Sequence, residues 1–251
     1  MKKDLSIEEI FDLAIQNHQK ENFELAEKLY RKILDANPSY AGVHYNLGIM
    51  YKELEELQKS INSYKKAIEI NPNYVEAHNN LGLALIESDE FKKGINCYEK
   101  AIHINPNYVE AHNNLGLAFK MLKEYHKSIN CYEKAIKLNP NHASAHSNLG
   151  LVFKELGEYQ KAINCYEKAI QVNPNFANVY YNLGNILQEL REIQKAKKCY
   201  EKLLNLDPTY NKGYSSYGNL LLKIAQYNKG LAYIRKGDGV IRFTQSDVRI
   251  V

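Results

Sequence analysis

The sequence predicts an all-α solenoid of tandem helix pairs, and three observations support this fold class. All six prolines lie 34 residues apart, which is the spacing of a repeated supersecondary unit. Apolar residues within each unit follow the i, i+3, i+4, i+7 pattern of two amphipathic helices. Small residues recur at fixed positions of successive units, where two helices must approach closely. The prolines are Pro38, Pro72, Pro106, Pro140, Pro174 and Pro208.

The segment 75–108 illustrates the predicted unit. Its first half, VEAHNNLGLALIES, places Ala77, Leu81 and Leu85 on one helical stripe, and its second half, FKKGINCYEKAIHI, repeats the pattern. The polar residues 88–90 between them predict a short turn. The second helix is expected to end before Pro106, because a proline disfavours helical geometry in the residue that precedes it.

The prolines also define the predicted organisation of the chain. A lead of residues 1–6 precedes the array, and a degenerate seventh unit, 211–238, is expected to cap it. The segment 239–251 indicates two short strands around a polar turn, either a β-hairpin or the beginning of a further domain. The six full units are 7–40, 41–74, 75–108, 109–142, 143–176 and 177–210.

Columns of small and large residues predict how the two helices of a unit pack. Glycine inside a helix costs about 1 kcal/mol relative to alanine, so a glycine column needs a packing reason. A tyrosine column in the second helices supplies the large complementary side chains. The glycines are Gly48, Gly82, Gly116, Gly150, Gly184 and Gly218. The tyrosines are Tyr30, Tyr64, Tyr98, Tyr132, Tyr166 and Tyr200.

These columns resemble the tetratricopeptide repeat family. The resemblance consists of the 34-residue period, Leu-Gly in the first helix, a small residue, an aromatic and Ala in the second, and the closing proline. It covers about residues 7–236. The family usually has Trp early in the first helix, where this chain has His44, His78, His112 and His146. The resemblance implies a right-handed superhelix whose concave face is built from the first helices, and it implies binding of peptides or protein segments without catalysis.

Composition narrows the function classes. The net charge of +4 is mild and lysines alternate with glutamates, which does not favour a nucleic-acid partner. The apolar runs are too short for a membrane span. The start, MKKDLSIEEIF, has no apolar segment typical of a secretory signal. Four cysteines stand one per unit, about 10 Å apart, too far for disulfides, so we expect free thiols in a cytoplasmic protein.

The sequence indicates no enzyme, no cofactor and no metal. It contains no glycine-rich phosphate loop, nucleophile elbow or HExxH motif, and no catalytic residues are assigned. The histidine column could suggest a metal, but neighbouring histidines would lie about 10 Å apart, whereas Zn²⁺ needs ligand atoms at about 2.1 Å. Packing histidines are the expected interpretation.

An asparagine column is the candidate binding surface. It lies one residue before the leucine of each first helix, and asparagine is unfavourable there because its side chain competes with the backbone for hydrogen bonds. An amide both donates and accepts, so each can pair with a peptide group of a bound strand. Units advance about 10 Å and an extended chain about 3.3–3.6 Å per residue, so five amides would follow roughly a dozen ligand residues. The column is Asn46, Asn80, Asn114, Asn148 and Asn182.

Neighbouring columns are expected to set the ligand preference. Their candidate contact residues are Tyr45, Asn79, Asn113, Tyr181 and Asn185. The asparagine ladder resembles that of the repeat region of O-linked N-acetylglucosamine transferases. This resemblance implies that the asparagines of this chain contact a bound polypeptide. No glycosyltransferase domain is recognisable in the sequence. Two other interpretations are open: recent duplication that preserved the asparagines, and amides that bond to adjacent helices and only stiffen the array.

The leading functional hypothesis is a non-catalytic scaffold that binds a protein or an extended peptide. One alternative is the substrate-recruiting region of a larger enzyme, such as a transferase or oxygenase, whose catalytic domain is absent. Another is self-association through the array ends or the C-terminal hairpin. RNA binding receives little electrostatic support. A carboxylate clamp built on Lys52, Lys120 and Lys154 is a poor match, because Ile86 interrupts that column and glutamates flank it.

Overall fold

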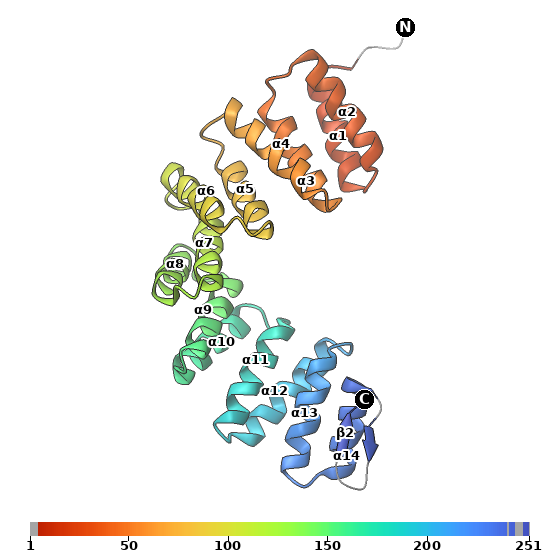
Figure 1. Ribbon diagram of the computed structural model, residues 1–251, viewed down its shortest axis with the longest axis vertical. Coiled ribbons are helices and arrows are strands. Elements are labelled where there is room, and N and C mark those ends of the chain that lie inside the picture. Colours follow the sequence, from red (N-terminus) through yellow and green to blue (C-terminus); the bar gives the residue numbers. More distant parts are fainter. Residues whose placement is uncertain (1–4, 240, 244–247, 251) are drawn as a thin grey trace. The chain divides into compact units, whose positions relative to one another are not determined.

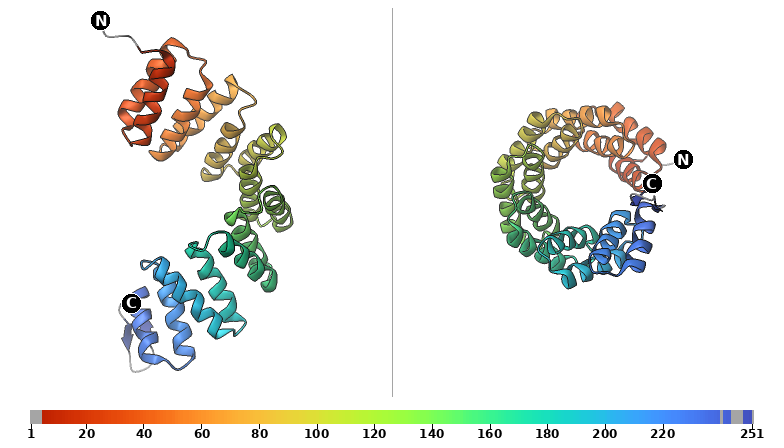
Figure 2. Two further views of the ribbon diagram at one scale, coloured as in Figure 1. Left: turned by 180° about the vertical axis from the view of Figure 1, so that it is seen from behind. Right: turned by 60° about the horizontal axis from the view of Figure 1, so that its bottom comes forward.

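The computed structural model describes residues 5–239, 241–243 and 248–250. Within them, fourteen helices and two three-residue strands follow one another along the chain (Figure 1). The chain divides into two compact units, Met1–Lys127 and Ser128–Val251, which are described separately. In each unit, consecutive helices form pairs that succeed one another in chain order (Figure 2). The predicted all-α fold of tandem helix pairs is confirmed.

The first unit contains three complete helix pairs and the helix that follows them. The first helices of the pairs are α1, α3 and α5, each joined to its partner by a turn of three residues such as 20–22. Contacts also join one pair to the next, from α2 to α3, α4 to α5 and α6 to α7. The helices are α1 (Ile7–Gln19), α2 (Phe23–Ala36), α3 (Ala41–Glu53), α4 (Leu57–Ile70), α5 (Val75–Glu87), α6 (Phe91–Ile104) and α7 (Val109–Met121).

The second unit continues the pattern with α9, α11 and α13 as first helices. The boundary between the units falls within α8, in which Lys127 and Ser128 are adjacent. Contacts join α9 to α10, α10 to α11, α11 to α12, α12 to α13 and α13 to α14. The helices are α8 (Tyr125–Leu138), α9 (Ala143–Glu155), α10 (Tyr159–Val172), α11 (Ala177–Glu189), α12 (Ile193–Leu206), α13 (Asn211–Lys223) and α14 (Tyr227–Asp238).

Glycine and tyrosine fit together inside each pair, as the sequence predicts. The ring of Tyr64 is 1% exposed, and a Cβ placed on Gly48 would lie 2.5 Å from its Cε1 atom. Such a contact is shorter than van der Waals packing allows, so only glycine lets α3 lie this close to α4. Ser60 adds a buried hydrogen bond across the same contact, because its Oγ donates to the carbonyl of Gly48 at 2.7 Å. Gly82, Gly150 and Gly184 face Tyr98, Tyr166 and Tyr200 in the same way.

The histidine column fastens the loops between pairs. Nε2 of His78 lies 2.9 Å from the carbonyl oxygen of Pro72, six residues earlier. His44, His112 and His146 contact their own proline carbonyls at 3.0 Å, and Tyr180 does so at 3.1 Å through its hydroxyl. Five first helices, α3, α5, α7, α9 and α11, are thereby tied to the loops that lead into them. No group of three His, Cys, Asp or Glu side chains in the described part of the chain is arranged to hold a metal ion.

The cysteine column is half-buried, and its thiols form no disulfide. Burial raises the pKa of Cys97, Cys165 and Cys199 to about 11, because an apolar environment disfavours the charged thiolate. These thiols are therefore protonated and weakly nucleophilic at neutral pH.

The chain ends in two short strands that follow α14. Strand β1 (Ile241–Phe243) pairs antiparallel with β2 (Val248–Ile250), with Arg242 opposite Arg249 in the register. The residues of the predicted turn, 244–247, lie outside the described residues, as do 240 and 251. None of the described helices combines the length and apolar character that crossing a membrane requires.

Candidate functional site

The asparagine column lies on the first helices and is half-buried throughout. Asn46, Asn80 and Asn114 belong to α3, α5 and α7 of the first unit. Asn148 and Asn182 belong to α9 and α11 of the second. Each precedes a leucine that is buried in the core, and the leucine after Asn80, Leu81, is 7% exposed. The column therefore lies at the edge of the core, where an amide keeps part of its surface in solvent.

In the first unit, the amides form a chain of hydrogen bonds across three helices. Nδ2 of Asn80 donates to the hydroxyl of Tyr45 at 3.2 Å, which joins α5 to α3. Nδ2 of Asn114 donates to Oδ1 of Asn79 at 3.0 Å, which joins α7 to α5. Within α5, Asn79 donates to Oδ1 of Asn80 at 3.2 Å, and within α7, Asn113 donates to Oδ1 of Asn114 at 3.3 Å. We call these five residues, Tyr45, Asn79, Asn80, Asn113 and Asn114, the amide network.

The amide network gives the members different roles. Asn79 is only 6% exposed, and its hydrogen bonds link its neighbours Asn80 and Asn114. Asn80 and Asn114 remain half-buried. An amide offers two N–H donors and two acceptor lone pairs, and the network uses one of each on both residues.

The other predicted contact residues have separate surroundings. Nδ2 of Asn46 donates to the carbonyl of Gly42 in its own helix at 2.8 Å. Asn185 accepts a 2.7 Å hydrogen bond from the hydroxyl of Tyr200, a core side chain. This contact explains the polar residue at a position where the preceding units have Leu or Ile, and it turns Asn185 toward the core.

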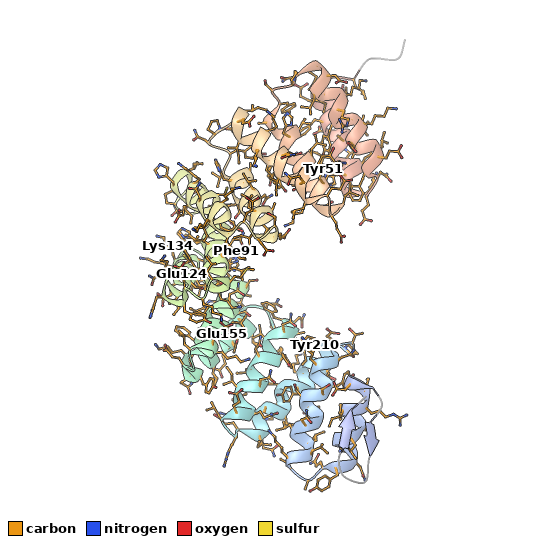
Figure 3. The ribbon with its side chains drawn as sticks, viewed as in Figure 1. Tyr51, Phe91, Glu124, Lys134, Glu155 and Tyr210 are labelled. Atoms are coloured by element: carbon orange, nitrogen blue, oxygen red, sulfur yellow. The ribbon has the colours of Figure 1, made fainter. Side chains whose placement is uncertain are left out.

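Two tyrosine pairs border the column. Tyr45 lies against Tyr74 with ring centroids 4.8 Å apart, and Tyr181 lies against Tyr210 at 5.2 Å. Tyr210, labelled in Figure 3, is the residue directly before α13. All four rings are half-buried. The sequence predicts Tyr45 and Tyr181 as contact residues but not Tyr74 and Tyr210 in the loops. The signal that points to these two is an aromatic residue directly before a first helix.

Carboxylates influence the tyrosines of the first unit. Burial raises the pKa of Tyr74 to about 12, and the charges near it, including Glu76, add to the effect. Burial also raises the pKa of Tyr108 to about 12, with Glu110 and Glu76 as further causes. The pKa of Tyr45 is raised by burial and then by Glu76. Glu76 therefore lies close enough to act on all three phenols.

Ion pairs connect the C-terminal ends of the first helices. Nζ of Lys52 lies 2.9 Å from Oε1 of Glu87, and Nε2 of His18 lies 2.9 Å from Oε2 of Glu53. Both pairs join residues 35 positions apart, the same separation as in Tyr45–Asn80 and Asn79–Asn114. Residue n of one first helix thus contacts residue n+35 of the next. Lys52 is thus paired with a carboxylate of the neighbouring first helix.

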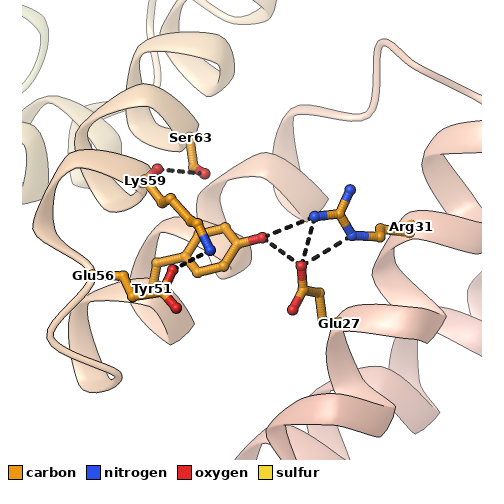
Figure 4. Close-up of polar contacts among 6 residues, drawn as sticks. All are labelled: Glu27, Arg31, Tyr51, Glu56, Lys59 and Ser63. Carbon is orange, nitrogen blue, oxygen red and sulfur yellow. Dashed lines mark hydrogen bonds and ion pairs between the residues drawn. The ribbon is translucent and has the colours of Figure 1, made fainter.

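A second polar cluster lies between the first two helix pairs and was not anticipated from the sequence (Figure 4). The hydroxyl of Tyr51 donates to Oε1 of Glu27 at 2.7 Å, and Nη2 of Arg31 donates to the same oxygen at 2.6 Å. The Tyr51 hydrogen bond is the largest cause of the lowered pKa of Glu27. Lys59 lies over the Tyr51 ring, 5.2 Å from its centroid, and pairs with Glu56. Glu27, Arg31 and Tyr51 satisfy one another, which indicates a structural joint.

Comparison with protein families identifies the repeat. A family model described as TPR repeat matches residues 48–89, 84–123 and 152–190. Two models described as Tetratricopeptide repeat match residues 109–142 and 177–210, and residues 131–164. Together the matches run without interruption from residue 48 to residue 210, more than half of the 251 residues. No curated protein matches the sequence.

Several solved structures are similar. The crystal structure of MamA protein is 28% identical, with a TM-score of 0.60, over 68% of this chain and 94% of that one. A tetratricopeptide repeat protein from Parabacteroides merdae is 18% identical, with a TM-score of 0.72, over 96% and 94%. YrrB, described as a TPR protein with an unusual peptide-binding site, is 19% identical, with a TM-score of 0.57, over 78% and 97%. At these identities, the last two show a common fold alone.

Proposed function

Since the chain belongs to the tetratricopeptide repeat family, we propose that it is a non-catalytic scaffold that binds an extended segment of another protein. The binding surface is the part of the first helices that carries the asparagine column. YrrB shares this fold and is described as a TPR protein with an unusual peptide-binding site, so a repeat array of this fold can bind a peptide. Half-buried cysteine thiols that form no disulfide are typical of a reducing compartment, so we also propose a cytoplasmic location.

The amide network is the observation that carries the proposal. Hydrogen bonds to neighbouring helices hold Asn80 and Asn114 in fixed orientations, so little side-chain entropy remains to be lost when a partner binds. Asn114 retains one donor and one acceptor beyond its network bonds, the combination that a peptide group needs. Asn80 also hydrogen-bonds the Tyr64 hydroxyl and retains an acceptor on its amide oxygen. The sequence-based alternative, in which the amides only stiffen the array, accounts for the same bonds, and the capture of peptides by amide variants distinguishes the two.

The proposed contacts differ between the units. In the first unit they are Asn80 and Asn114, supported by Tyr45, Asn46 and Asn113. In the second unit they are Asn148 and Asn182 beside Tyr181, while Asn185 acts through its contact with Tyr200. Backbone recognition of this kind selects extended conformation rather than sequence, because every residue of a partner presents the same peptide groups.

The test is capture of extended peptides on an array by the Asn80→Ala/Asn114→Ala variant. Two lost hydrogen bonds of about 1 kcal/mol each predict affinity reduced by about tenfold or more, with helicity retained in circular dichroism. The matched control is Asn62→Ala/Asn96→Ala, the same substitution one unit apart on α4 and α6, where both side chains are exposed. Equal capture by the wild type and the Asn80→Ala/Asn114→Ala variant would remove the site from the asparagine column.

The two alternatives predicted from sequence have their own tests. The longer-enzyme hypothesis requires further coding sequence in the reading frame, which genomic sequence decides directly. Self-association through the array ends has some support at the N-terminal end, where Leu13 of α1 and Leu25 of α2 are 37% and 47% exposed. Light scattering over a concentration series tests it, and a monomer at every concentration would contradict it.

A further inference from the structure

The two tyrosine pairs beside the asparagine column occupy equivalent positions in the 34-residue repeat, four repeats apart along the chain. Tyr45 and Tyr74 in the first unit correspond to Tyr181 and Tyr210 in the second. Their ring planes are inclined by 35° and 48°, so each pair presents a shallow, tilted aromatic surface. All four rings keep part of their surface in solvent. Such a surface can accept an apolar, aromatic or cationic side chain.

The charge next to the two pairs is opposite. Glu76 follows Tyr74 by two residues, and Lys212 follows Tyr210 by two residues. Both side chains are exposed. None of the ion pairs found among the described residues involves Glu76, so its carboxylate is not neutralised there. The same aromatic surface is thus acidic in the first unit and basic in the second.

The surrounding helices reinforce the sign in the first unit. The first helices α1, α3, α5 and α7 contain seven carboxylates and two lysines, whereas the second helices α2, α4 and α6 contain nine cationic residues and five carboxylates. One of those two lysines, Lys52, is paired with Glu87. In the second unit, α9, α11 and α13 contain two carboxylates and three lysines. The first helices of the first unit therefore carry a local excess of negative charge.

We propose that Tyr45, Tyr74 and Glu76 form a subsite for a basic side chain of the bound segment, with arginine preferred. A guanidinium stacks on a tyrosine face through its plane and charge, and the carboxylate adds electrostatic attraction. The first unit thereby selects basic segments among the extended peptides that the amide network accepts. This inference rests on the proposed function, because the subsite lies next to Asn80, whose amide bonds to Tyr45.

Binding of three fluorescein-labelled peptides tests the subsite. The probes alternate Gly and Ser with Arg, Gln or Glu and share one length of about a dozen residues, which is enough to extend past the asparagines of the first unit. Fluorescence anisotropy should show the Arg peptide binding about tenfold more tightly than the Gln peptide, from a cation–π contact and an ion pair together. The Glu peptide should bind most weakly, and added salt should reduce the differences.

Variants locate the preference. Glu76→Gln and Tyr74→Leu should each remove most of the Arg-to-Gln ratio, and Glu76→Gln should leave the thermal midpoint unchanged because the side chain is exposed. The matched control is Glu110→Gln. Glu110 occupies the position of Glu76 in the following 34-residue repeat. One repeat after Tyr45, Asn79 stands at the position that corresponds to it. This control should retain the ratio.

The outcomes separate the subsite from the proposed function. Equal binding of the three peptides by the wild type, or an unchanged Arg-to-Gln ratio in Glu76→Gln, would overturn the subsite. If the Asn80→Ala/Asn114→Ala variant still lowered the affinity for every peptide, the scaffold proposal would stand without it. If that variant bound all peptides as the wild type does while Glu76→Gln lost the ratio, the amide network would fall and the subsite would stand.

Discussion

At the scale of the residue, glycines in one helix have opposite roles. A Cβ on Gly48 would lie 2.5 to 3.0 Å from three atoms of the Tyr64 ring, which the core holds in place. A Cβ on Gly42, six residues earlier in α3, would meet Tyr40 and Phe11 at 3.5 and 3.6 Å, which is ordinary contact. The first glycine is required by packing. The second only adds conformational freedom to the unfolded chain.

This contrast predicts alanine substitutions of opposite sign. Gly48→Ala should destabilise the protein by roughly 1–3 kcal/mol, because overpacking of a rigid ring exceeds the gain in helix propensity. Gly42→Ala should stabilise it by up to about 1 kcal/mol, since propensity acts there without a clash. Urea denaturation of both variants measures the two free energies. A Gly48→Ala variant as stable as the wild type would contradict the packing argument.

At the scale of the element, the turns inside each helix pair have one shared backbone conformation. A residue with φ near 60° occurs in every such turn that the structure describes, although only one of these residues is glycine. That glycine, Gly157, has φ of 75° and no atom near the place of a Cβ, so it relieves backbone strain alone. The other positions are Glu21, Glu55, Asp89, Lys123, Arg191 and Ala225.

Substitutions in these turns should change stability in a predictable direction. A left-handed backbone costs a non-glycine residue about 1–2 kcal/mol, and glycine loses about 0.5–1 kcal/mol of unfolded-state entropy relative to alanine. Arg191→Gly should therefore stabilise the protein by about 0.5 kcal/mol, and Gly157→Ala should destabilise it by a similar amount. Denaturation midpoints measure both. A destabilised Arg191→Gly variant would show that the arginine side chain contributes contacts worth more than the strain.

Elements were predictable from the sequence to a larger extent than the site. Proline spacing and the Leu-Gly pattern predict the helix pairs, because both act through local backbone geometry and close packing. The burial of Asn79 and the bond from Asn80 to Tyr45 depend on how one pair rotates against the next. The 34-residue repeat length does not determine the angle of that rotation. The n to n+35 contacts that express it became visible only in the structure.

At the scale of the whole molecule, the stability of the protein should depend on pH, because the same ionisable group, a half-buried cysteine thiol, recurs in several repeats. The thiols of Cys97, Cys165 and Cys199 have pKa values of about 11 in the folded chain. An unfolded thiol has a pKa of about 8.5. Above that pH the unfolded chain binds fewer protons than the folded chain, so the free energy of unfolding falls as pH rises toward 11.

The loss should appear between pH 8 and pH 10, before most tyrosines of the unfolded chain ionise at a pKa of about 10. We expect a decrease of roughly 1 kcal/mol per thiol, after allowance for solvent screening at half-buried positions. The Cys97→Ala/Cys165→Ala/Cys199→Ala variant should show a smaller slope of unfolding free energy against pH. Parallel slopes for the two proteins would assign the pH dependence to other groups.

The n to n+35 contacts have a consequence for the history of the array. Each of them pairs a particular side chain of one repeat with a particular side chain of the next. Exchanging or removing a near-identical repeat therefore changes which side chains meet. Excising residues 75–108 in one step would leave the period intact and keep an asparagine opposite Tyr45, since Asn114 would take the place of Asn80. Lys52 would then face Met121 in place of Glu87. Recombination between such repeats therefore preserves the architecture but leaves a mismatched charge at the new junction, which records where the exchange occurred.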